Sequence, residues 1–401
     1  MFLVKEQLEA QALASLDTFS IETPSWGYAD TGTRFGKFRQ PGAAITFSDK
    51  ASDAKQVHRF TGCCPKLAVH VLWDLSEEDD GSVAANQAKT EDLEIGSINA
   101  NTFQDQVYKF GSFANPDPAV RRQALKHVKR CLTIAENTSK VTTLWFADGT
   151  NYPGQDDVRA RKRRFEDGLA EVASAAPEGH MVLLEYKPFE PAFYQTDVAD
   201  WGMAAHYCRK AGGPFKVLVD TGHHYLSQNV EQIVAWLLDE GMLGGFHFND
   251  RRYADDDLTL GSIDPYQIFR IFAEIHGFAF DTEQSPHIEY MIDQSHNLKP
   301  KVEAMIQTVC RAQELYVKAA LVDFKSLREH QRAGNLVDAE EELQRAFRQD
   351  VTPLLAQWRK ARGLPEEPLA AFRADGYADR VAAERQSRRE AAGPTSDDAY
   401  A

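Results

Sequence analysis

Acidic and imidazole side chains cluster around two short β-rich runs in the middle of the chain, 216–219 and 243–248. A helix-like segment separates the runs, which is the strand–helix–strand pattern of a parallel sheet with functional groups at its carboxyl edge. Carboxylate and imidazole groups are common protein ligands of divalent cations. The groups are Asp220, His223, His247, Asp255 and Asp257. Together they predict a metal site, whereas a solvated loop would explain the acidic run 255–257 taken alone.

Eight β-rich runs alternate with helix-like segments along the first three quarters of the chain. Most are continuous apolar runs, which is typical of strands in a parallel sheet covered by helices. Eight such units predict an α/β fold, the (β/α)8 or TIM barrel, whose chemistry belongs at the carboxyl ends of the strands. The expected strands are 20–26, 67–73, 93–99, 141–146, 181–186, 216–220, 243–248 and 287–293.

The residues from 298 onward show only helical patterns, over 298–320, 336–349 and 351–362. We therefore expect a barrel with the metal site over 1–297, and a helical C-terminal extension over 298–401. Such an extension is expected to hold subunits together rather than to do chemistry. The charged tail after Glu384 is expected to be disordered, because it has few apolar residues to bury.

Composition narrows the classes of partner. The 401 residues include 45 basic and 60 acidic side chains, a net charge of −15, which argues against nucleic acid or an anionic membrane as a partner. Five scattered cysteines without a C-x-x-C pair argue for a reducing compartment and against a zinc ribbon. The N-terminal segment lacks a signal-peptide pattern, and no apolar run is long enough to span a bilayer. We expect a cytoplasmic protein.

The ends of the fifth to eighth expected strands, together with the loops that follow them, collect seven metal-binding groups. Oxygen-rich ligand sets with one imidazole each suit Mn²⁺, Mg²⁺ or Co²⁺ better than a structural zinc. Asp220 is placed to belong to both sets, which predicts two cations bridged by one carboxylate. Lys187 follows two residues after a ligand and is expected at the same mouth. The strand-end set is Glu185, Asp220, His247 and Asp293, and the loop set is His223, Asp255 and Asp257.

Longer motifs occur in a fixed order between about residues 20 and 385. They are P-S-W-G-x4-G-T-R-F (24–35), H-x2-W-D (70–74), N-T-F (101–103), E-x-K-x-x-E-P-A-F-Y (185–194), V-D-x-G-H-H (219–224), G-G-F-H-F-N-D (244–250), Y-x-D-D-D-L (253–258) and M-I-D-Q-S-H-N (291–297). In these motifs the chain resembles the L-rhamnose isomerase family, in its broad-specificity bacterial branch within the xylose-isomerase-like barrels. More distant xylose isomerases have an acid where this chain has His247, which favours the rhamnose-isomerase branch. Tyr186 stands where relatives often have His and bears on substrate preference.

The resemblance implies a reversible aldose–ketose isomerisation, L-rhamnose to L-rhamnulose, with related aldoses also accepted. It implies two divalent cations per chain, Mn²⁺ first among them. The strand-end set would hold a structural ion and the loop set a catalytic ion, with Asp220 shared. A divalent ion can polarise the carbonyl and hold two sugar oxygens while hydrogen moves between C1 and C2. Whether hydrogen moves as a hydride or through an enediol stays open.

The remaining roles concern the substrate, a small neutral sugar. Lys187 is expected to stabilise a developing alkoxide, and His70 to contact the ring oxygen with Asp74 orienting it. Asp257 completes the catalytic set. Taken alone, His70, Trp73 and Trp145 are better explained as core residues than as substrate contacts. The expected apolar walls are Trp26, Phe103 and Trp145.

The Gly-rich loop 27–38 lies beside the expected mouth and contains Phe35. In relatives this loop covers a neighbouring subunit's site. We therefore expect a homotetramer in which Phe35 closes the partner's pocket, with local packing of Phe35 as the alternative.

Three other functions are compatible with a barrel of this kind. A sugar epimerase is the nearest, and it typically needs one metal ion and two carboxylates flanking the sugar. A metal-dependent phosphodiesterase or endonuclease would want more histidine ligands and basic grooves, which the charge of −15 disfavours. A non-catalytic sugar-binding protein would be expected to have lost ligands, yet all seven are present.

Overall fold

The computed structural model describes residues 5–33, 36–75, 78–189 and 194–392, and at its centre is a closed barrel of eight parallel strands. The first and last strands pair with each other, so the barrel sheet has no free edge. The barrel confirms the predicted fold. In barrel order the strands are β1 (Ile21–Pro24), β4 (Lys66–His70), β5 (Glu94–Asn99), β6 (Val141–Leu144), β8 (Met181–Glu185), β10 (Phe215–Asp220), β11 (Leu243–Phe248) and β12 (Glu289–Ile292).

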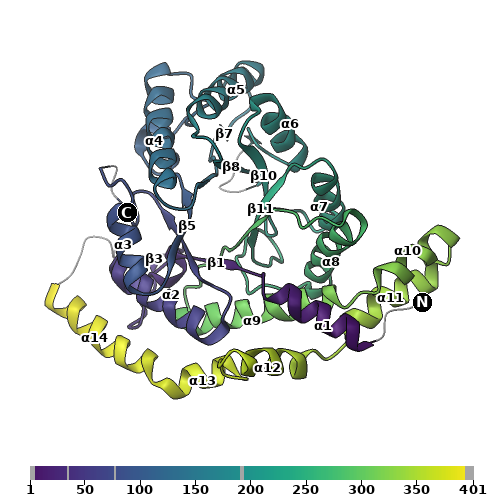
Figure 1. The fold of residues 1–401 in the computed structure, drawn as a ribbon. Helices are drawn as coiled ribbons and strands as arrows, with labels where there is room; N and C mark the ends of the chain where they lie inside the picture. The colour runs from purple at the N-terminus through teal and green to yellow at the C-terminus, as the bar shows by residue number, and fades with distance from the viewer. Residues whose placement is uncertain (1–4, 34–35, 76–77, 190–193, 393–401) are drawn as a thin grey trace.

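Helices surround the barrel and alternate with its strands along the chain (Figure 1). Those after β1 are α2 (Phe47–Thr61), α3 (Ser82–Thr90), α4 (Pro118–Glu136), α5 (Val158–Ala175), α6 (Trp201–Ala211), α7 (Val230–Asp239), α8 (Pro265–Thr282) and α9 (Lys301–Ala320). Smaller elements are α1 (Lys5–Leu16), η1 (Ser25–Tyr28), η2 (Gln106–Tyr108), and the strand pairs β2 (Gly32–Thr33) with β3 (Gly36–Lys37) and β7 (Gly149–Thr150) with β9 (Gln195–Thr196). Within the part of the chain that the structure describes, no helix combines the length and apolar character that crossing a membrane requires.

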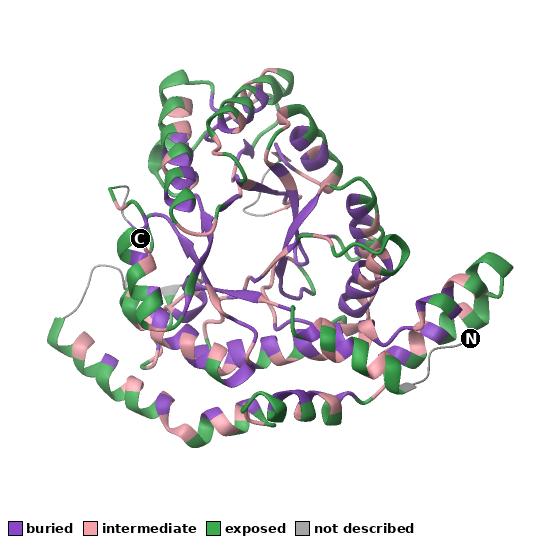
Figure 2. Cartoon of the chain, viewed as in Figure 1, coloured by how far each residue is buried: buried purple, intermediate pink, exposed green. Residues whose placement is uncertain are grey.

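Apolar side chains cover both faces of the barrel strands. Val182 and Leu184 of β8 belong to the main hydrophobic core, whereas Leu183 packs with Val141 and Leu218 in a separate small cluster. Alternate residues of one strand thus serve two cores, because successive side chains point to opposite faces of a sheet. This explains why the strands are continuous apolar runs in the sequence. Figure 2 shows the result, with buried strands inside helices whose outer sides are exposed.

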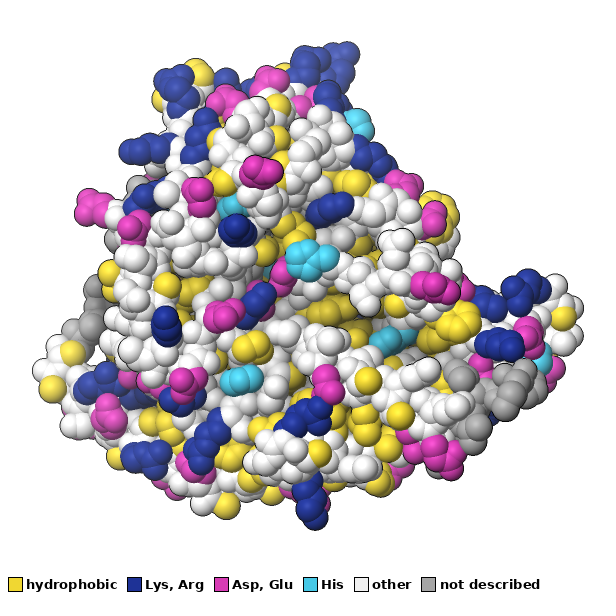
Figure 3. Space-filling view, in the orientation of Figure 1, with side chains coloured by type: hydrophobic (Ala, Val, Ile, Leu, Met, Phe, Trp, Pro, Cys, Tyr) yellow, Lys and Arg dark blue, Asp and Glu magenta, His cyan; other side chains and the backbone are white. Residues whose placement is uncertain are grey.

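The outer surface carries charged side chains of both signs. In the space-filling view of Figure 3, acidic and basic groups are interspersed over the face shown, with hydrophobic groups between them.

Local sequence signals start several of the surrounding helices. Asp117 accepts a hydrogen bond from the Ala119 amide at the start of α4, where Pro118 occupies the first helical position. Asp264 caps α8 in the same way before Pro265. A capping carboxylate satisfies amides that have no partner within the helix, and proline lacks the amide that would be unpaired there.

The chain after β12 runs along the outside of the barrel. Helix α9 packs against α8, α1 and α2, next to the strands that close the barrel. The later helices form an arm beyond it (Figure 1). They are α10 (Phe324–Ala333), α11 (Leu336–Arg348), α12 (Thr352–Ala361), α13 (Pro368–Asp375) and α14 (Tyr377–Ala392).

The prediction of disorder after Glu384 is wrong for residues 385–392, which belong to α14. Arg385 is 2% exposed and donates to Asp53 of α2 from Nη1 to Oδ2 at 2.8 Å. Arg389 donates to Asp30 Oδ2 at 3.1 Å and to backbone oxygens of the loop that follows β1. Those backbone acceptors are Gln40, Pro41 and Ala43, at 3.0, 2.9 and 2.8 Å. The last described helix therefore fixes the base of the first loop.

A half-buried histidine in the helical layer makes stability depend on pH. The His276 ring of α8 lies 4.5 Å from the Tyr316 ring, and its Nε2 is buried without a hydrogen-bond partner among the described residues. Burial lowers the pKa of His276 to about 4, although a hydrogen bond with the Tyr316 backbone opposes the shift. An unfolded chain binds the proton near pH 6.5, so the free energy of unfolding falls as pH drops from about 6.5 to about 4.

We expect this group alone to remove about 2 kcal/mol of stability between about pH 7.5 and about pH 5. Urea unfolding at the two pH values checks it, since His276→Phe should reduce the pH dependence by that amount. His287→Gln, which changes a side chain that is 79% exposed, serves as the control. An unchanged pH dependence in His276→Phe would contradict the assignment.

Candidate metal centre

Four side chains from consecutive barrel strands converge at the carboxyl ends of those strands. Each offers one ligand atom, and the four atoms lie within 4.8 Å of one another. Glu185 ends β8, Asp220 ends β10, His247 lies near the end of β11, and Asp293 directly follows β12. The strand register sets Asp220 beside His247. All of the predicted strand-end set is thus brought together, and we call Glu185, Asp220, His247 and Asp293 the strand-end group.

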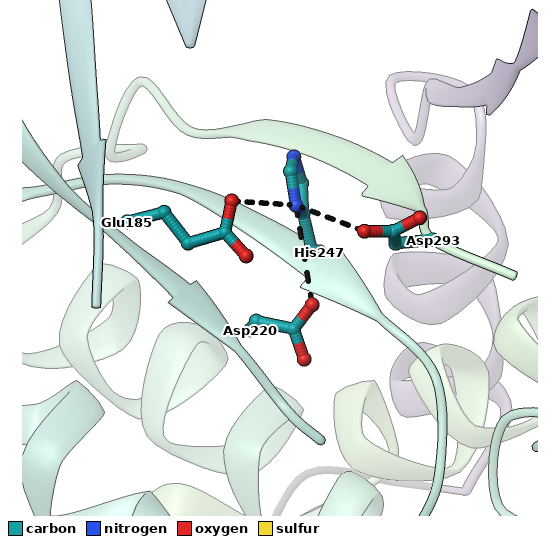
Figure 4. A group of neighbouring side chains, drawn as sticks. All are labelled: Glu185, Asp220, His247 and Asp293. Carbon is teal, nitrogen blue, oxygen red and sulfur yellow. Dashed lines mark ion pairs between the residues drawn. The ribbon is translucent and has the colours of Figure 1, made fainter. Parts of the chain in front are cut away.

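The imidazole of His247 is the centre of this group. Its Nδ1 lies 3.3 Å from Glu185 Oε2, 3.4 Å from Asp293 Oδ2 and 3.9 Å from Asp220 Oδ2. Figure 4 shows the three carboxylates pointing toward this ring from three sides.

The donor set fits a divalent cation. Burial alone would lower the pKa of His247, but the Glu185 and Asp293 carboxylates raise it well above its ordinary range. A buried cluster of three carboxylates thus favours positive charge at its centre. Among the described residues, neither ring nitrogen of His247 makes a hydrogen bond, and Nδ1 faces the carboxylates as an ion pair, so the ring can serve as a ligand. Three oxygens and one nitrogen suit Mn²⁺, Mg²⁺ or Co²⁺.

A second set of ligand atoms lies beside the first and shares one carboxylate with it. It comprises Asp220, His223 and Asp255, again within 4.8 Å of one another. His223 Nδ1 lies 2.9 Å from the Tyr186 carbonyl oxygen, so this nitrogen donates and leaves Nε2 to face Asp255 Oδ2 at 3.4 Å. A backbone acceptor of this kind fixes the orientation of metal-binding histidines. We call Asp220, His223 and Asp255 the loop group.

Charged side chains around the loop group lie close enough to change one another's pKa values. Burial, together with Glu185 and Asp255, raises the pKa of Asp220 to about 7, against the opposing effect of His223. Lys187 Nζ lies 2.5 Å from Asp255 Oδ2 and 5.4 Å from the centre of the Trp145 ring. The predicted lysine therefore lies at the loop group, as the spacing after Glu185 indicated.

Asp257 lies close to the loop group, but it is not among the ligand atoms that meet within 4.8 Å. Its backbone is in the left-handed region with φ of 47°, and its carbonyl oxygen accepts from His296 Nε2 at 2.8 Å. Burial, and then the neighbouring Asp255, raises the pKa of its carboxyl well above the usual range. Its role as a ligand stays a prediction.

A cavity of about 220 Å³ opens beside both groups. The predicted substrate contacts Trp26, His70, Phe103, Trp145 and Lys187 all line it, with Asp255, Asp257 and most of the strand-end group. A larger groove of about 730 Å³ lies at the opposite ends of the strands and contains none of the predicted site residues. Size alone therefore does not identify the site. Phe35 lies outside the described residues.

Aromatic rings form one wall of this cavity. The Phe103 and Trp145 ring centres are 4.8 Å apart, and Trp26 Nε1 donates to Asp293 Oδ1 at 3.0 Å. One wall residue therefore hydrogen-bonds a member of the strand-end group directly. Trp73, which the sequence left as a core candidate, stacks on His70 at 3.8 Å and is 40% exposed.

The expectation that Asp74 orients the His70 ring is wrong. Asp74 Oδ2 accepts from the backbone amide of His70 at 2.8 Å, whereas the ring Nδ1 lies 3.2 Å from the Val71 carbonyl oxygen. Asp74 also pairs with Lys50 Nζ at 2.5 Å, so it fixes the end of β4 and not the imidazole. Burial lowers the pKa of His70 to about 4, which leaves a neutral ring at the cavity.

Sequence reasoning missed several polar residues near the groups. Asn99 is the last residue of β5 and lines the cavity, so the strand-end rule would have found it. Asn249 lies two residues after His247 within the motif G-G-F-H-F-N-D, and its side chain donates to Asp220, a contact that the motif does not indicate. Tyr186 Oη lies 2.6 Å from His224 Nε2 behind the ligands, a pairing that no spacing predicts.

Known proteins that resemble this chain include barrel proteins and probable sugar isomerases. The family model described as xylose isomerase-like TIM barrel matches residues 69–281. A protein of Rhizobium meliloti named a probable sugar isomerase is 38% identical over 378 residues, covering 93% of this chain and 87% of its own. One of the same description from Mesorhizobium japonicum is 37% identical with the same coverage.

Solved structures of low identity share the fold. A Sinorhizobium meliloti protein superposes with a TM-score of 0.51 at 17% identity, covering 73% of this chain and 96% of its own. An L-ribulose 3-epimerase gives 0.50 at 13% identity, covering 82% and 97%. From its own motif match, its near full-length relatives and its barrel, this chain belongs to the xylose isomerase-like TIM barrel family.

Proposed function

We propose that the protein is a metal-dependent aldose–ketose isomerase, with L-rhamnose to L-rhamnulose as the reaction that its motifs favour and related aldoses as further substrates. The observation that carries the proposal is the pair of ligand groups sharing Asp220 at the wall of one cavity. The two relatives named probable sugar isomerases support the reaction class. The motifs of the rhamnose-isomerase branch support the choice of sugar.

Two divalent cations, Mn²⁺ first among them, would be held by the two groups, with Asp257 joining the loop group. Such ions supply polarisation of a sugar carbonyl and a template for two sugar oxygens. Lys187 places an ammonium group at the same wall, where it can bind an oxygen that gains negative charge. The neutral imidazole of His70 can form a hydrogen bond with a sugar hydroxyl or with the ring oxygen of the sugar.

The aromatic wall gives the cavity its selectivity for a compact substrate. Trp26, Phe103 and Trp145 present apolar faces that suit the C–H faces of a sugar and exclude water from the reacting carbons. The lining thus offers apolar rings to the C–H faces of a monosaccharide and polar groups to its hydroxyls.

We also propose that the chain forms a homotetramer, the assembly that the resemblance implies, with the residues from 298 onward contributing to the contacts between subunits. Sedimentation of the purified protein tests this assembly.

The direct test is a panel of aldoses incubated with the protein and Mn²⁺, followed by NMR detection of ketoses. We expect L-rhamnose to yield L-rhamnulose, with slower conversion of aldoses that differ at one stereocentre. Ketoses converted only into their 3-epimers would establish the epimerase instead. No conversion of any sugar would refute the proposal.

Removal of metal should lower both turnover and thermal stability. The buried carboxylates repel one another without a cation, and an ion that binds only the folded chain adds about 2.7 kcal/mol at a hundred times its Kd. We expect dialysis against EDTA to abolish ketose formation and lower Tm, and Mn²⁺ or Co²⁺ to restore both. Full activity of protein shown to be metal-free by elemental analysis would contradict the site.

The two groups should respond differently to substitution. Asp257→Ala should lower kcat by about 10²-fold or more and leave Tm nearly unchanged, because it removes a carboxylate that a loop carries and no barrel strand supports. Glu185→Ala should lower Tm as well, because Glu185 belongs to the buried strand-end group. Asp256→Asn is the matched control, since Asp256 Oδ2 accepts from the amides of Arg252 and Tyr253 in the same loop. Near-normal kcat in Asp257→Ala would place the catalytic ion elsewhere.

A further inference from the structure

Asn249 lies between the two candidate metal groups without being a ligand of either. It follows β11, and its side chain is fully buried. Its Nδ2 lies 3.1 Å from Asp220 Oδ1 and 3.3 Å from Asp257 Oδ1. A carboxamide nitrogen carries two hydrogens, so it can donate one to each of these carboxylates.

The two neighbouring carboxylates fix which way the carboxamide points. Thr221 Oγ1 accepts from the Asn249 amide at 3.0 Å and donates to the Asn249 carbonyl oxygen at 2.9 Å, which holds the Asn249 backbone in place. The same hydroxyl lies 3.4 Å from Asn249 Oδ1, but its one hydrogen is already donated to the carbonyl oxygen. Nδ2 therefore faces Asp220 and Asp257 because a flipped amide would set its oxygen against two carboxylates.

Gly222 makes room for this arrangement. A Cβ at that position would lie 2.6 Å from Asn249 Oδ1, closer than real Cβ contacts allow. The glycine after Thr221 therefore permits the close approach of the Asn249 side chain to the turn that carries Asp220 and His223.

Asp257 requires such support more than the other candidate ligands. The strand-end group is carried by or directly adjoins barrel strands, whereas Asp257 lies in a loop with its backbone at a φ of 47°. Residues other than glycine adopt this region at an energetic cost, and such conformations persist where the surroundings hold them. His296 holds the Asp257 backbone oxygen at 2.8 Å, and Asn249 holds its carboxylate.

We infer that Asn249 is a positioning residue that joins the loop carboxylate Asp257 to the shared carboxylate Asp220 and thereby sets the affinity of the loop group for its ion. The inference rests on the proposed function, because it takes both groups to bind divalent cations. Asn249 acts on the loop group far more than on the strand-end group, since Asp257 lacks the support of a strand. Removing it leaves Glu185, His247 and Asp293 where the barrel places them.

The test is calorimetric titration of metal-free protein with Mn²⁺. We expect the wild-type chain to bind two ions, and Asn249→Ala to keep the Kd of one within about threefold while weakening the other by about 10- to 100-fold. The kcat of the variant should recover at Mn²⁺ concentrations that refill the weak site, which a general loss of structure would not allow. Asn115→Ala, a truncation of a buried asparagine that donates to the Gly111 carbonyl oxygen, should leave both ions unchanged.

A double-mutant cycle with Asp257→Asn tests the connection itself. If Asn249 acts through Asp257, the double variant should bind the weaker ion no less tightly than the more affected single variant. Where Asn249→Ala does not fold, Asn249→Ser replaces it in the same measurements, because its hydroxyl still fills part of the space beside Thr221.

Additive effects in the cycle, equal weakening of both ions, or two unchanged affinities would each overturn the inference. A wild-type chain that binds fewer than two ions would overturn it too. A wild-type chain that binds two ions yet converts no aldose would refute the proposed function and leave the role of Asn249 intact.

Discussion

Repulsion between carboxylates is the constraint on which this site is built. Acidic groups from three strand ends and one loop converge beside a space of about 220 Å³, where little water remains to screen them. Three nearby cationic or hydrogen-bond-donating side chains reduce that repulsion. His247 is surrounded by three carboxylates, Lys187 contacts Asp255, and Asn249 donates to Asp220. A folded chain keeps such a cluster only if positive charge is supplied, by protons or by bound cations.

The barrel contributes rigidity to this arrangement. Two apolar cores, one between strands and helices and one among Val141, Leu183 and Leu218, hold the strands on both faces. Side chains at strand ends inherit that rigidity, so the strands themselves bring the strand-end group together, and Trp26 and Asn249 add hydrogen bonds to Asp293 and Asp220. The loop group depends instead on hydrogen bonds to backbone atoms, such as that between His223 Nδ1 and the Tyr186 carbonyl oxygen. The rigid group is therefore suited to hold an ion permanently, and the loop group to meet a substrate.

Periodicity and the strand-end rule were enough to predict the barrel and the meeting of Glu185, Asp220, His247 and Asp293, because both follow from the geometry of parallel strands. They could not give the distance of Asp257 from its neighbours, since a left-handed loop residue has no periodic signal. The polar composition of the tail after Glu384 predicts disorder. Its order comes from Arg385 meeting Asp53, a partner 332 residues away in the chain. The role predicted for Asp74 is wrong because its carboxylate accepts from the backbone amide of His70 and not from the ring, which the spacing of side chains in the sequence does not show.

The hydrogen bonds between α14 and the loop after β1 also affect the order in which the protein folds during synthesis. A ribosome releases Trp26 and the loop residues long before Arg389, because Asp30 and Arg389 are 359 residues apart in the chain. The barrel strands can pair before the tail emerges, whereas the backbone oxygens of Gln40, Pro41 and Ala43 must wait for it. The loop beside the cavity wall that contains Trp26 is thus held by α14 only after all eight barrel strands have been made.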